Sequence, residues 1–392
     1  MNTIYLDNNA TTRIAPEVIE EMLPYLKEFY GNPSSMHTFG GQLYKKIEEA
    51  RERTAELLRA EPEEIIFASC GTESDNTAIM SAVESFPNKR HIITTRVEHP
   101  AVRNFCKHLA RKGFRITFLS VNNHGQLDIN DLLKAIEGDT LLVTIMYANN
   151  EVGNIFPLEE ISEILKERRI LFHTDAVQAV GKIPVDLKKL PVDMLSLSGH
   201  KLHAPKGVGA LYVRKGTRFY PYIIGGHQEK GRRAGTENVA SIIGLGKACE
   251  LARNNLDEEI VYLKRLRDKL ETSLLKLCTD VRINGDVNSR LPNTTSLSFE
   301  YVEGEAILLR LNEYGICASS GSACSSGSLE PSHVLRAMGV PFTAIHGSIR
   351  FSLSRYNTEE EIDKVIEIIP GIIKELRLLS PFGRDKLSRK VK

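Results

Sequence analysis

Short runs of consecutive apolar residues recur through the first half of the chain, separated by stretches with helical periodicity. The runs span residues 65–68, 92–94, 116–119, 141–145, 170–172, 194–197 and 209–213. Several are continuous rather than alternating, which is typical of strands covered on both faces. Because the runs alternate with helices, they predict βαβ units and an α/β fold with a mostly parallel sheet between helices.

A strongly periodic helix is predicted before the first of these strands. Its apolar positions are Ile47, Ala50, Thr54, Leu57 and Leu58. The charged residues among them, residues 45–46, 48–49 and 51–53, are interpreted as a solvent-exposed face and not as a binding patch.

The pattern changes after residue 256. Apolar positions between 260 and 277 predict a long helix, followed by strands at 295–299 and 348–353 and by a last helix that Pro370 is expected to break. We therefore predict a large domain over residues 15–256. A smaller α+β domain would comprise residues 1–14 and 257–392 and would carry a loop of small polar residues at 316–328.

Composition narrows the possible partners. The 392 residues carry 51 basic and 50 acidic side chains, a net charge of +1, which argues against nucleic acid or an anionic membrane as main partner. No apolar run approaches the ~18 residues of a membrane span, and the first residues do not resemble a secretion signal. Six scattered cysteines without a C-x-x-C pair are expected to be free thiols, so the predicted location is the cytoplasm.

Polar residues that follow the predicted strands are candidates for a site, because ligands of parallel sheets bind beyond the carboxyl ends of the strands. Residues 69–74 form a turn that contains Gly71 and Thr72 and leads into a helix, which suits either a phosphate group or plain helix capping. His99 could stack on an aromatic ligand or move protons, or be an ordinary polar loop residue. Asn150 could bind a ligand or close a turn.

Two further strands end in residues with stronger chemistry. Asp175 follows a buried strand, where a carboxylate needs a cationic partner such as a protonated pyridine nitrogen, with Gln178 nearby; the alternative is a helix-capping aspartate with an exposed glutamine. Lys201 follows the next strand, where its amine could form a Schiff base with an aldehyde. Ser198 and His200 could contact a phosphate, whereas the alternative is a surface lysine in a basic turn.

Together these groups are the parts needed to bind pyridoxal phosphate as an electron sink. The motifs in which they stand are Tyr-Leu-Asp-Asn-Asn-Ala-Thr-Thr at 5–12, Gly-Thr-Glu-Ser at 71–74, Glu-His at 98–99, Asn-Asn-Glu at 149–151, His-Thr-Asp-Ala-Val-Gln at 173–178, Ser-Gly-His-Lys at 198–201, Arg-Ala-Gly-Thr-Glu-Asn at 233–238, Ser-Ser-Gly-Ser-Ala-Cys at 319–324 and Ser-Ile-Arg-Phe-Ser at 348–352. With these motifs the whole chain resembles the NifS/IscS family of cysteine desulfurases, and residues 324–335 are most similar to the NifS branch. The resemblance implies the pyridoxal-phosphate-dependent aspartate-aminotransferase fold, fold type I.

The resemblance also implies a role for each site residue. Lys201 would bind the cofactor as a Schiff base, Asp175 would pair with the pyridine nitrogen, and Gln178 would form a hydrogen bond with the phenolic oxygen. His99 would stack on the ring and move protons. The phosphate would be held by Gly71, Thr72, Ser198 and His200, and by Thr236 from the other subunit of a homodimer, whereas the substrate carboxylate would be held by Asn150 and Arg350. Asn150 would also contact the cofactor. Taken alone, Arg350 would be interpreted as a solvated residue at a strand end.

The implied reaction releases L-alanine from L-cysteine and leaves a persulfide on Cys324, which a mobile Ser/Gly loop would carry to an iron–sulfur scaffold protein of the NifU/IscU type. Cys324 could also share in ligating an iron–sulfur cluster. The alternatives are a selenocysteine lyase, another fold type I aminotransferase, or a non-enzymatic iron–sulfur scaffold. Cys70 departs from the Gly or Ala expected there, and is either an inert small residue or a site of oxidative sensitivity.

Overall fold

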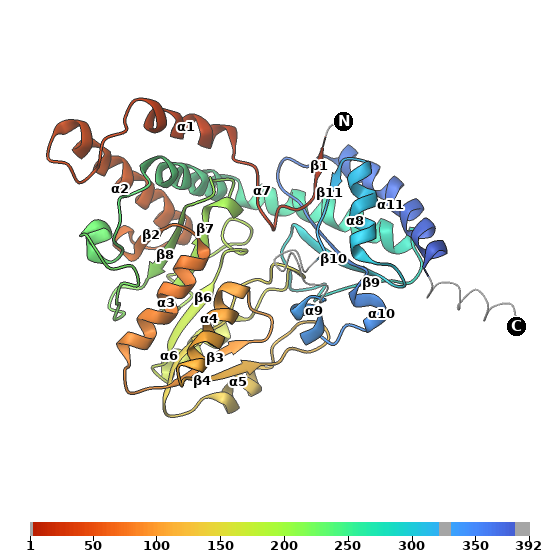
Figure 1. Cartoon of the computed structure of the whole chain (residues 1–392), viewed down its shortest axis with the longest axis horizontal. Coiled ribbons are helices and arrows are strands. Elements are labelled where there is room, and N and C mark those ends of the chain that lie inside the picture. The colour runs from red at the N-terminus through yellow and green to blue at the C-terminus, as the bar shows by residue number, and fades with distance from the viewer. Residues whose placement is uncertain (1–2, 321–330, 381–392) are drawn as a thin grey trace, which may run out of the picture.

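A seven-stranded sheet forms the centre of the larger part of the molecule (Figure 1). The computed structural model describes residues 3–320 and 331–380. In chain order the strands of this sheet are β2 (Ile65–Ala68), β3 (His91–Thr95), β4 (Arg115–Leu119), β5 (Thr140–Thr144), β6 (Leu171–Asp175), β7 (Met194–Ser198) and β8 (Gly209–Val213). Their spatial order is β2-β8-β7-β6-β5-β3-β4, with β8 antiparallel to both neighbours and all other pairs parallel. The predicted α/β class with a mostly parallel sheet is confirmed.

Helices cover both faces of this sheet. They are α1 (Pro16–Lys27), α2 (Thr38–Leu58), α3 (Gly71–Ser85), α4 (Pro100–Arg111), α5 (Ile129–Ala135) and α6 (Leu158–Glu167). Apolar side chains of α3 and α4 pack on one face, and those of α2 and α6 contribute to the core on the other. Strands β3, β5, β7 and β8 are buried along their whole length, as their continuous apolar runs predict.

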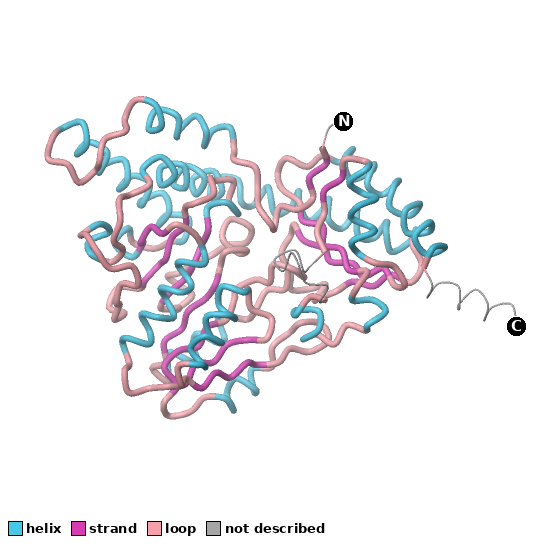
Figure 2. The backbone as a smooth tube through the Cα atoms, in the orientation of Figure 1, coloured by secondary structure: helices cyan, strands magenta, loops and turns pink. Residues whose placement is uncertain are grey.

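The smaller part of the molecule has its own apolar core. An antiparallel sheet of β9 (Val281–Ile283), β10 (Thr294–Phe299) and β12 (Ser348–Ser352) packs with α8 (Gly304–Glu313) and α11 (Glu359–Leu379). Strand β1 (Ile4–Tyr5) returns to this part and pairs in parallel with β11 (Ile316–Cys317). Figure 2 shows the strands of the two parts as separate groups. Short helices α9 (His333–Ala337) and α10 (Phe342–Ile345) add side chains to the larger core.

One long helix, α7 (Val239–Leu277), belongs to both cores (Figure 1). The prediction placed the long helix after residue 256, which is too late. Small residues precede the leucine pattern, and at Gly246 an added Cβ would lie 2.6 Å from the Ala50 Cα of α2. The first half of α7 therefore packs through close backbone approach, which leaves no leucine periodicity in the sequence.

Two local predictions are wrong. Helix α11 continues through Pro370, because buried side chains on both sides of the proline, among them Ile369 and Ile372, hold it against the smaller core and offset a cost of about 3 kcal/mol. Arg51 does not lie on a solvated face: it is 4% exposed and forms a bidentate ion pair with Glu229, at 2.7 and 2.8 Å. The partner carboxylate, distant in sequence, makes this burial possible.

The described cysteines, Cys70, Cys106, Cys249, Cys278 and Cys317, are free thiols, as predicted. Within residues 3–320 and 331–380, none of the helices combines the length and the apolar character that crossing a membrane requires.

Candidate active site

A cavity of about 280 Å³ lies at the carboxyl ends of the central strands. The predicted site residues that line it are Gly71, Thr72, His99, Asn150, Asp175, Gln178, Ser198, His200, Lys201 and Arg350. Asp175 ends β6 and Ser198 ends β7, whereas Gly71 opens α3 directly after β2. The parallel arrangement of the central strands brings these distant segments to one edge, which is why sequence position relative to the strands identified them.

The turn before α3 caps the helix, and its geometry is also compatible with the phosphate site that the sequence left open. Cys70 caps the helix, since its Sγ accepts a hydrogen bond from the Glu73 backbone N–H at 3.5 Å. At Gly71 an added Cβ would lie 2.8 Å from Val177 Cγ2 and 3.5 Å from Ser198 Cβ, so only glycine fits. The first turn of α3 therefore opens on the cavity with its free N–H groups, an arrangement suited to an anion.

The inner wall of the cavity is acidic. Asp175 is buried, and burial raises the pKa of its carboxyl although His99, Lys201 and the Val177 backbone N–H act in the opposite sense. Asp75, which the sequence analysis missed, also lines the cavity; burial and the charge of Asp175 raise its pKa. Asp75 Oδ1 has no hydrogen-bond partner. A protonated ring nitrogen bound at this wall would supply the positive charge that these two carboxyl groups lack.

No helix follows Asp175, so the helix-capping interpretation of this residue is wrong. Its Oδ1 accepts the Val177 N–H at 2.9 Å within a turn. Gln178 is buried in that turn rather than exposed, and its Nε2 donates to the Asn9 carbonyl oxygen at 2.9 Å. The turn therefore delivers both side chains to the cavity.

Lys201 stands opposite the acidic wall, at the end of the short η2 turn (Gly199–Lys201). Its Nζ donates to the carbonyl oxygens of Asn9 and Ala10, at 2.5 and 2.6 Å. It is therefore not a surface lysine, because backbone from the N-terminal segment directs its amine at the cavity. Asn9 is therefore a site residue, although the motif at residues 5–12 alone predicts no role for it.

The two histidines of the site are neutral bases. Burial lowers the pKa of the His99 imidazole, and its Nδ1 accepts a hydrogen bond from the Ala101 N–H at 3.2 Å, which assigns its proton to Nε2. Burial and then the charge of Lys201 lower the pKa of His200 to about 4. His200 Nδ1 lies 3.2 Å from Thr11 Oγ1.

Arg350 lies in β12 of the smaller part and is buried, which contradicts a solvated strand end. Its Nη2 pairs with Asp7 Oδ1 at 2.6 Å and its Nη1 donates to the Asn150 carbonyl oxygen at 2.8 Å. Nε has no partner. Asp7 and Asn150 thus hold the guanidinium at the mouth of the cavity, where it can meet a carboxylate.

Thr236 does not line this cavity: it is exposed on the segment before α7, away from the lining residues. Cys324 lies outside the described residues.

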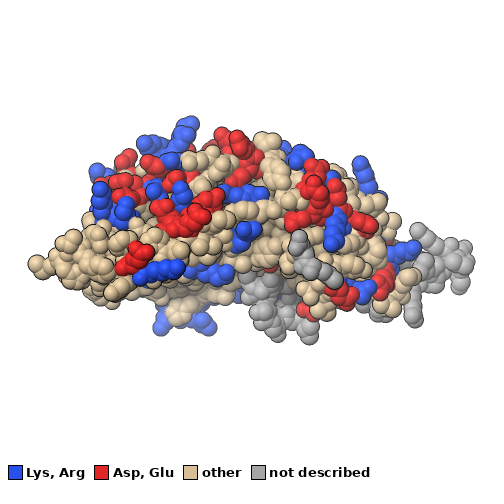
Figure 3. All heavy atoms as spheres, turned by 90° about the horizontal axis from the view of Figure 1, so that it is seen from above, with Lys and Arg blue, Asp and Glu red and all other residues tan. Residues whose placement is uncertain are grey.

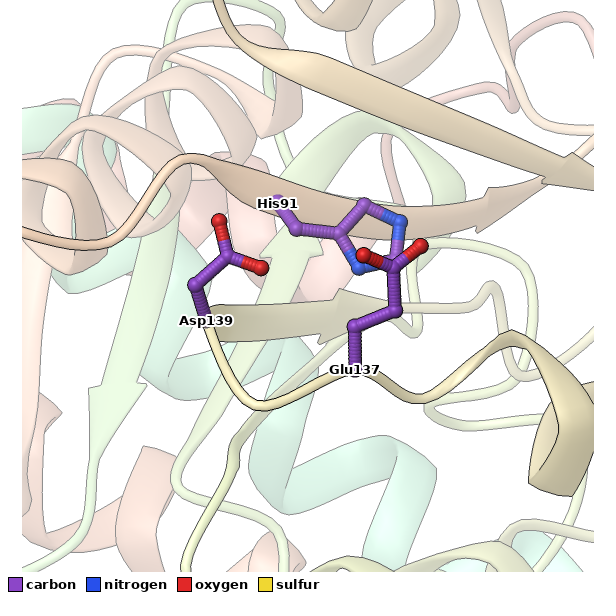
Figure 4. Close-up of side chains that lie close together, drawn as sticks. All are labelled: His91, Glu137 and Asp139. Carbon is purple, nitrogen blue, oxygen red and sulfur yellow. The ribbon is translucent and has the colours of Figure 1, made fainter.

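Metal-ligating side chains gather once in the described chain, at His91, Glu137 and Asp139 (Figure 4). The two ring nitrogens of His91 already contact Thr140 Oγ1 and Thr117 Oγ1, at 2.8 and 2.9 Å. Arg115 pairs with both carboxylates, each at 2.6 Å. The group is therefore an internally satisfied ion-pair cluster and not a metal centre.

Comparisons with known proteins agree with this geometry. The aminotransferase class-V family matches residues 4–365. A cysteine desulfurase of Trichormus azollae is 64% identical over 386 residues, which cover 98% of this chain and 96% of that protein. The cysteine desulfurase NifS of Azotobacter vinelandii is 55% identical over 383 residues, with 97% and 95% covered. A solved structure described as a NifS-like protein has a TM-score of 0.90 at 43% identity and covers 96% of this chain and 100% of its own.

Glu98, a buried residue directly before His99, gives a pH test of the burial of a carboxyl group beside the acidic wall. Burial raises its pKa to about 8, against about 4.3 in an unfolded chain. Below both values the folded and unfolded states hold the same proton and the carboxyl has no effect on stability. Between them only the unfolded state ionises, so the free energy of unfolding falls as pH rises, and above about 8 the loss is constant.

We therefore expect the Glu98→Gln protein without cofactor to gain thermal stability over the native chain as pH is raised from about 5 to about 9. Melting temperatures across that range measure the effect. Glu84→Gln, at an exposed position of α3, is the control for the loss of one charge. A Glu98→Gln advantage that stays constant with pH would contradict the raised pKa.

Proposed function

This chain belongs to the aminotransferase class-V family and is a cysteine desulfurase, and from that premise we propose how its cavity performs the reaction. The observation that carries the proposal is the convergence of an amine, an acidic wall and a guanidinium on one cavity: Lys201, Asp175 and Arg350. We propose that the cavity binds pyridoxal phosphate together with L-cysteine.

The residues present suit this cofactor. The glycine that a Cβ would crowd and the open helix terminus accept a phosphate, and the buried acidic wall accepts a ring nitrogen. Gly71, Thr72, Ser198 and His200 would hold the phosphate, Asp175 the ring nitrogen, His99 the ring face, Gln178 and Asn150 the ring substituents, and Lys201 Nζ the carbonyl carbon. When bound, pyridoxal phosphate supplies an electron sink that weakens the bonds of an attached amino acid.

Arg350 would bind the carboxylate of L-cysteine. Its guanidinium is the positively charged group at the mouth of the cavity, and Asp7 fixes its orientation through Nη2. Asn150 holds Nη1 through its carbonyl oxygen. The amino group of the substrate would then face Lys201, whose Nζ is positioned by two carbonyl oxygens and could carry a proton there. His99, neutral and with Nε2–H, can exchange protons at the same place.

Cys324 would receive the sulfur atom. Its thiolate attacks the sulfur of the substrate, the carbon–sulfur bond breaks, and a proton replaces sulfur on the carbon, so that L-cysteine and one enzyme thiol give L-alanine and one enzyme persulfide. The Ser and Gly residues around Cys324 suit a carrier that would move between cavity and surface.

We propose an iron–sulfur scaffold protein of the NifU/IscU type as the acceptor, because a relative at 55% identity is named NifS. Shared ligation of an iron–sulfur cluster by Cys324 belongs to the same proposal. The free thiols favour a reducing compartment such as the cytoplasm.

A second copy of the chain would complete the site. Exposed apolar side chains cluster on α1, α2 and their connection: Ile19, Leu23, Leu26, Phe29, Tyr30, Met36, Phe39 and Tyr44. The end of the molecule where this connection lies carries few charged side chains, at the left in Figure 3. Burial of this patch in a homodimer would remove its apolar side chains from water. It would also allow Thr236, exposed and outside its own cavity, to reach the phosphate of the partner.

Replacing the proposed sulfur carrier should separate the two halves of the reaction. We expect Cys324→Ala to abolish sulfide release from L-cysteine while the visible absorption of the bound cofactor is unchanged. Cys278→Ala, which removes a thiol at the far end of α7, should retain both sulfide release and the cofactor absorption. Sulfide release by Cys324→Ala at the native rate would favour a lyase mechanism, and a kinetic comparison of L-cysteine with selenocysteine would then test for a selenocysteine lyase.

Removing the partner of Arg350 should weaken substrate binding. We expect Asp7→Asn to raise KM for L-cysteine by about tenfold, with a smaller change in kcat, because a charge-assisted hydrogen bond that orients the guanidinium is lost. Steady-state kinetics measure the effect, and Asp186→Asn, which breaks an exposed ion pair with Arg59, is the control. An unchanged KM would show that Asp7 does not position Arg350.

Placing a charge in the apolar patch should disrupt the homodimer. We expect Met36→Glu, at a fully exposed position, to sediment as a monomer and to bind pyridoxal phosphate more weakly, since the partner's contribution is lost. Val261→Glu, an exposed position on α7, is the control. A Met36→Glu protein that remains dimeric would place the interface elsewhere.

A further inference from the structure

Lys182 is a buried lysine that the reaction described above does not use. It lies on the segment after β6 and is 9% exposed. Its Nζ donates to Gln178 Oε1 at 2.6 Å and to Asn9 Oδ1 at 3.4 Å. Lys182 does not line the cavity, whereas Gln178 and Asn9 do. It therefore stands directly behind two residues that face the site.

The partners of Gln178 determine which way its amide group faces. A backbone carbonyl oxygen only accepts hydrogen bonds, so the Asn9 carbonyl oxygen requires the Nε2 end of the amide, and the Lys182 amine donates to the Oε1 end. With Lys182 on Oε1 and the Asn9 carbonyl oxygen on Nε2, both partners select the same orientation. One N–H of the amide remains for the cavity, so Gln178 presents a donor there and not an acceptor.

The groups around Lys182 disfavour a positive charge on its amine. The groups that interact electrostatically with Lys182 are the cations Lys201 and Arg350 and the histidines His200 and His203. Burial, and then the two cations, lower the pKa of Lys182 well below its usual value. In the described chain no carboxylate forms an ion pair with Lys182. An anionic oxygen bound beside Gln178 would supply the missing negative charge.

We propose that Lys182 is a positioning residue: by holding Gln178 Oε1 it directs the amide N–H of Gln178 toward an anionic aromatic oxygen in the cavity. This inference rests on the proposed binding of pyridoxal phosphate, whose ring carries such an oxygen. Lys182 acts through Gln178 and touches neither the cofactor nor the substrate. Its effect is to fix one of two amide orientations that would otherwise compete.

A double-mutant cycle with Lys182→Met and Gln178→Ala tests the proposal. The dissociation constant of pyridoxal phosphate and the position of its visible absorption band are measured for the native chain, both single variants and the double variant. We expect each single variant to bind the cofactor about tenfold more weakly, as for one charge-assisted hydrogen bond. We expect the double variant to be no weaker than Gln178→Ala alone.

Lys188→Met, on the same segment but exposed, is the matched control and should retain the native affinity and band. Lys182→Arg keeps N–H donors and should restore most of the affinity; it also serves if Lys182→Met does not fold. A purely structural role would lower the melting temperature and leave the band in place, and its effect would add to that of Gln178→Ala.

Native-like cofactor binding by Lys182→Met, or additive losses in the double variant, would overturn the proposal while the native chain still binds pyridoxal phosphate and releases alanine. Failure of the native chain to bind the cofactor would instead overturn the proposed function, and this inference with it. The two failures are thus distinguished by the native protein alone.

Discussion

The hydrogen bonds of Asn9 connect the two parts of the molecule. Its carbonyl oxygen receives Lys201 and Gln178 from the central sheet. Its side-chain amide donates to Thr294 Oγ1 at 2.8 Å and its backbone N–H donates to Ser352 Oγ at 2.9 Å, both in the smaller sheet. Because a buried polar network must be satisfied in full, these bonds fix one arrangement of the two cores. The cavity has its shape because that arrangement is unique.

The electrostatics of the cavity follow from the same junction. The central sheet provides the acidic wall with Asp75 and Asp175, whereas Lys201 and Arg350 stand on the opposite side and at the mouth. The two aspartates are buried, so a negative charge on either one is costly without a positive charge nearby. A ligand that carries both a cationic ring nitrogen and anionic groups meets these requirements at once. The charges of the site therefore suit the zwitterionic ligand that we propose.

Much of the fold and site could be predicted because strand runs are local signals. The runs located the ends of β6 and β7, and hence Asp175 and Lys201, without knowledge of the topology. Lys182 and Asp75 were missed because a lysine or aspartate in sequence looks exposed, and only tertiary packing buries it. Arg51 was wrongly placed for the same reason, since its partner Glu229 is distant in the chain. The prediction that Pro370 breaks the last helix was wrong because packing of this helix against the smaller core outweighs the local preference of proline.

The shared helix α7 has a consequence for how the chain could be divided. No flexible linker separates the two cores at residue 256, since 39 residues of continuous helix cross that point. A recombinant or proteolytic split there would leave each fragment with half a helix and an uncovered apolar face. The two halves should therefore melt as one cooperative unit, and neither is expected to exist as an independently folded module.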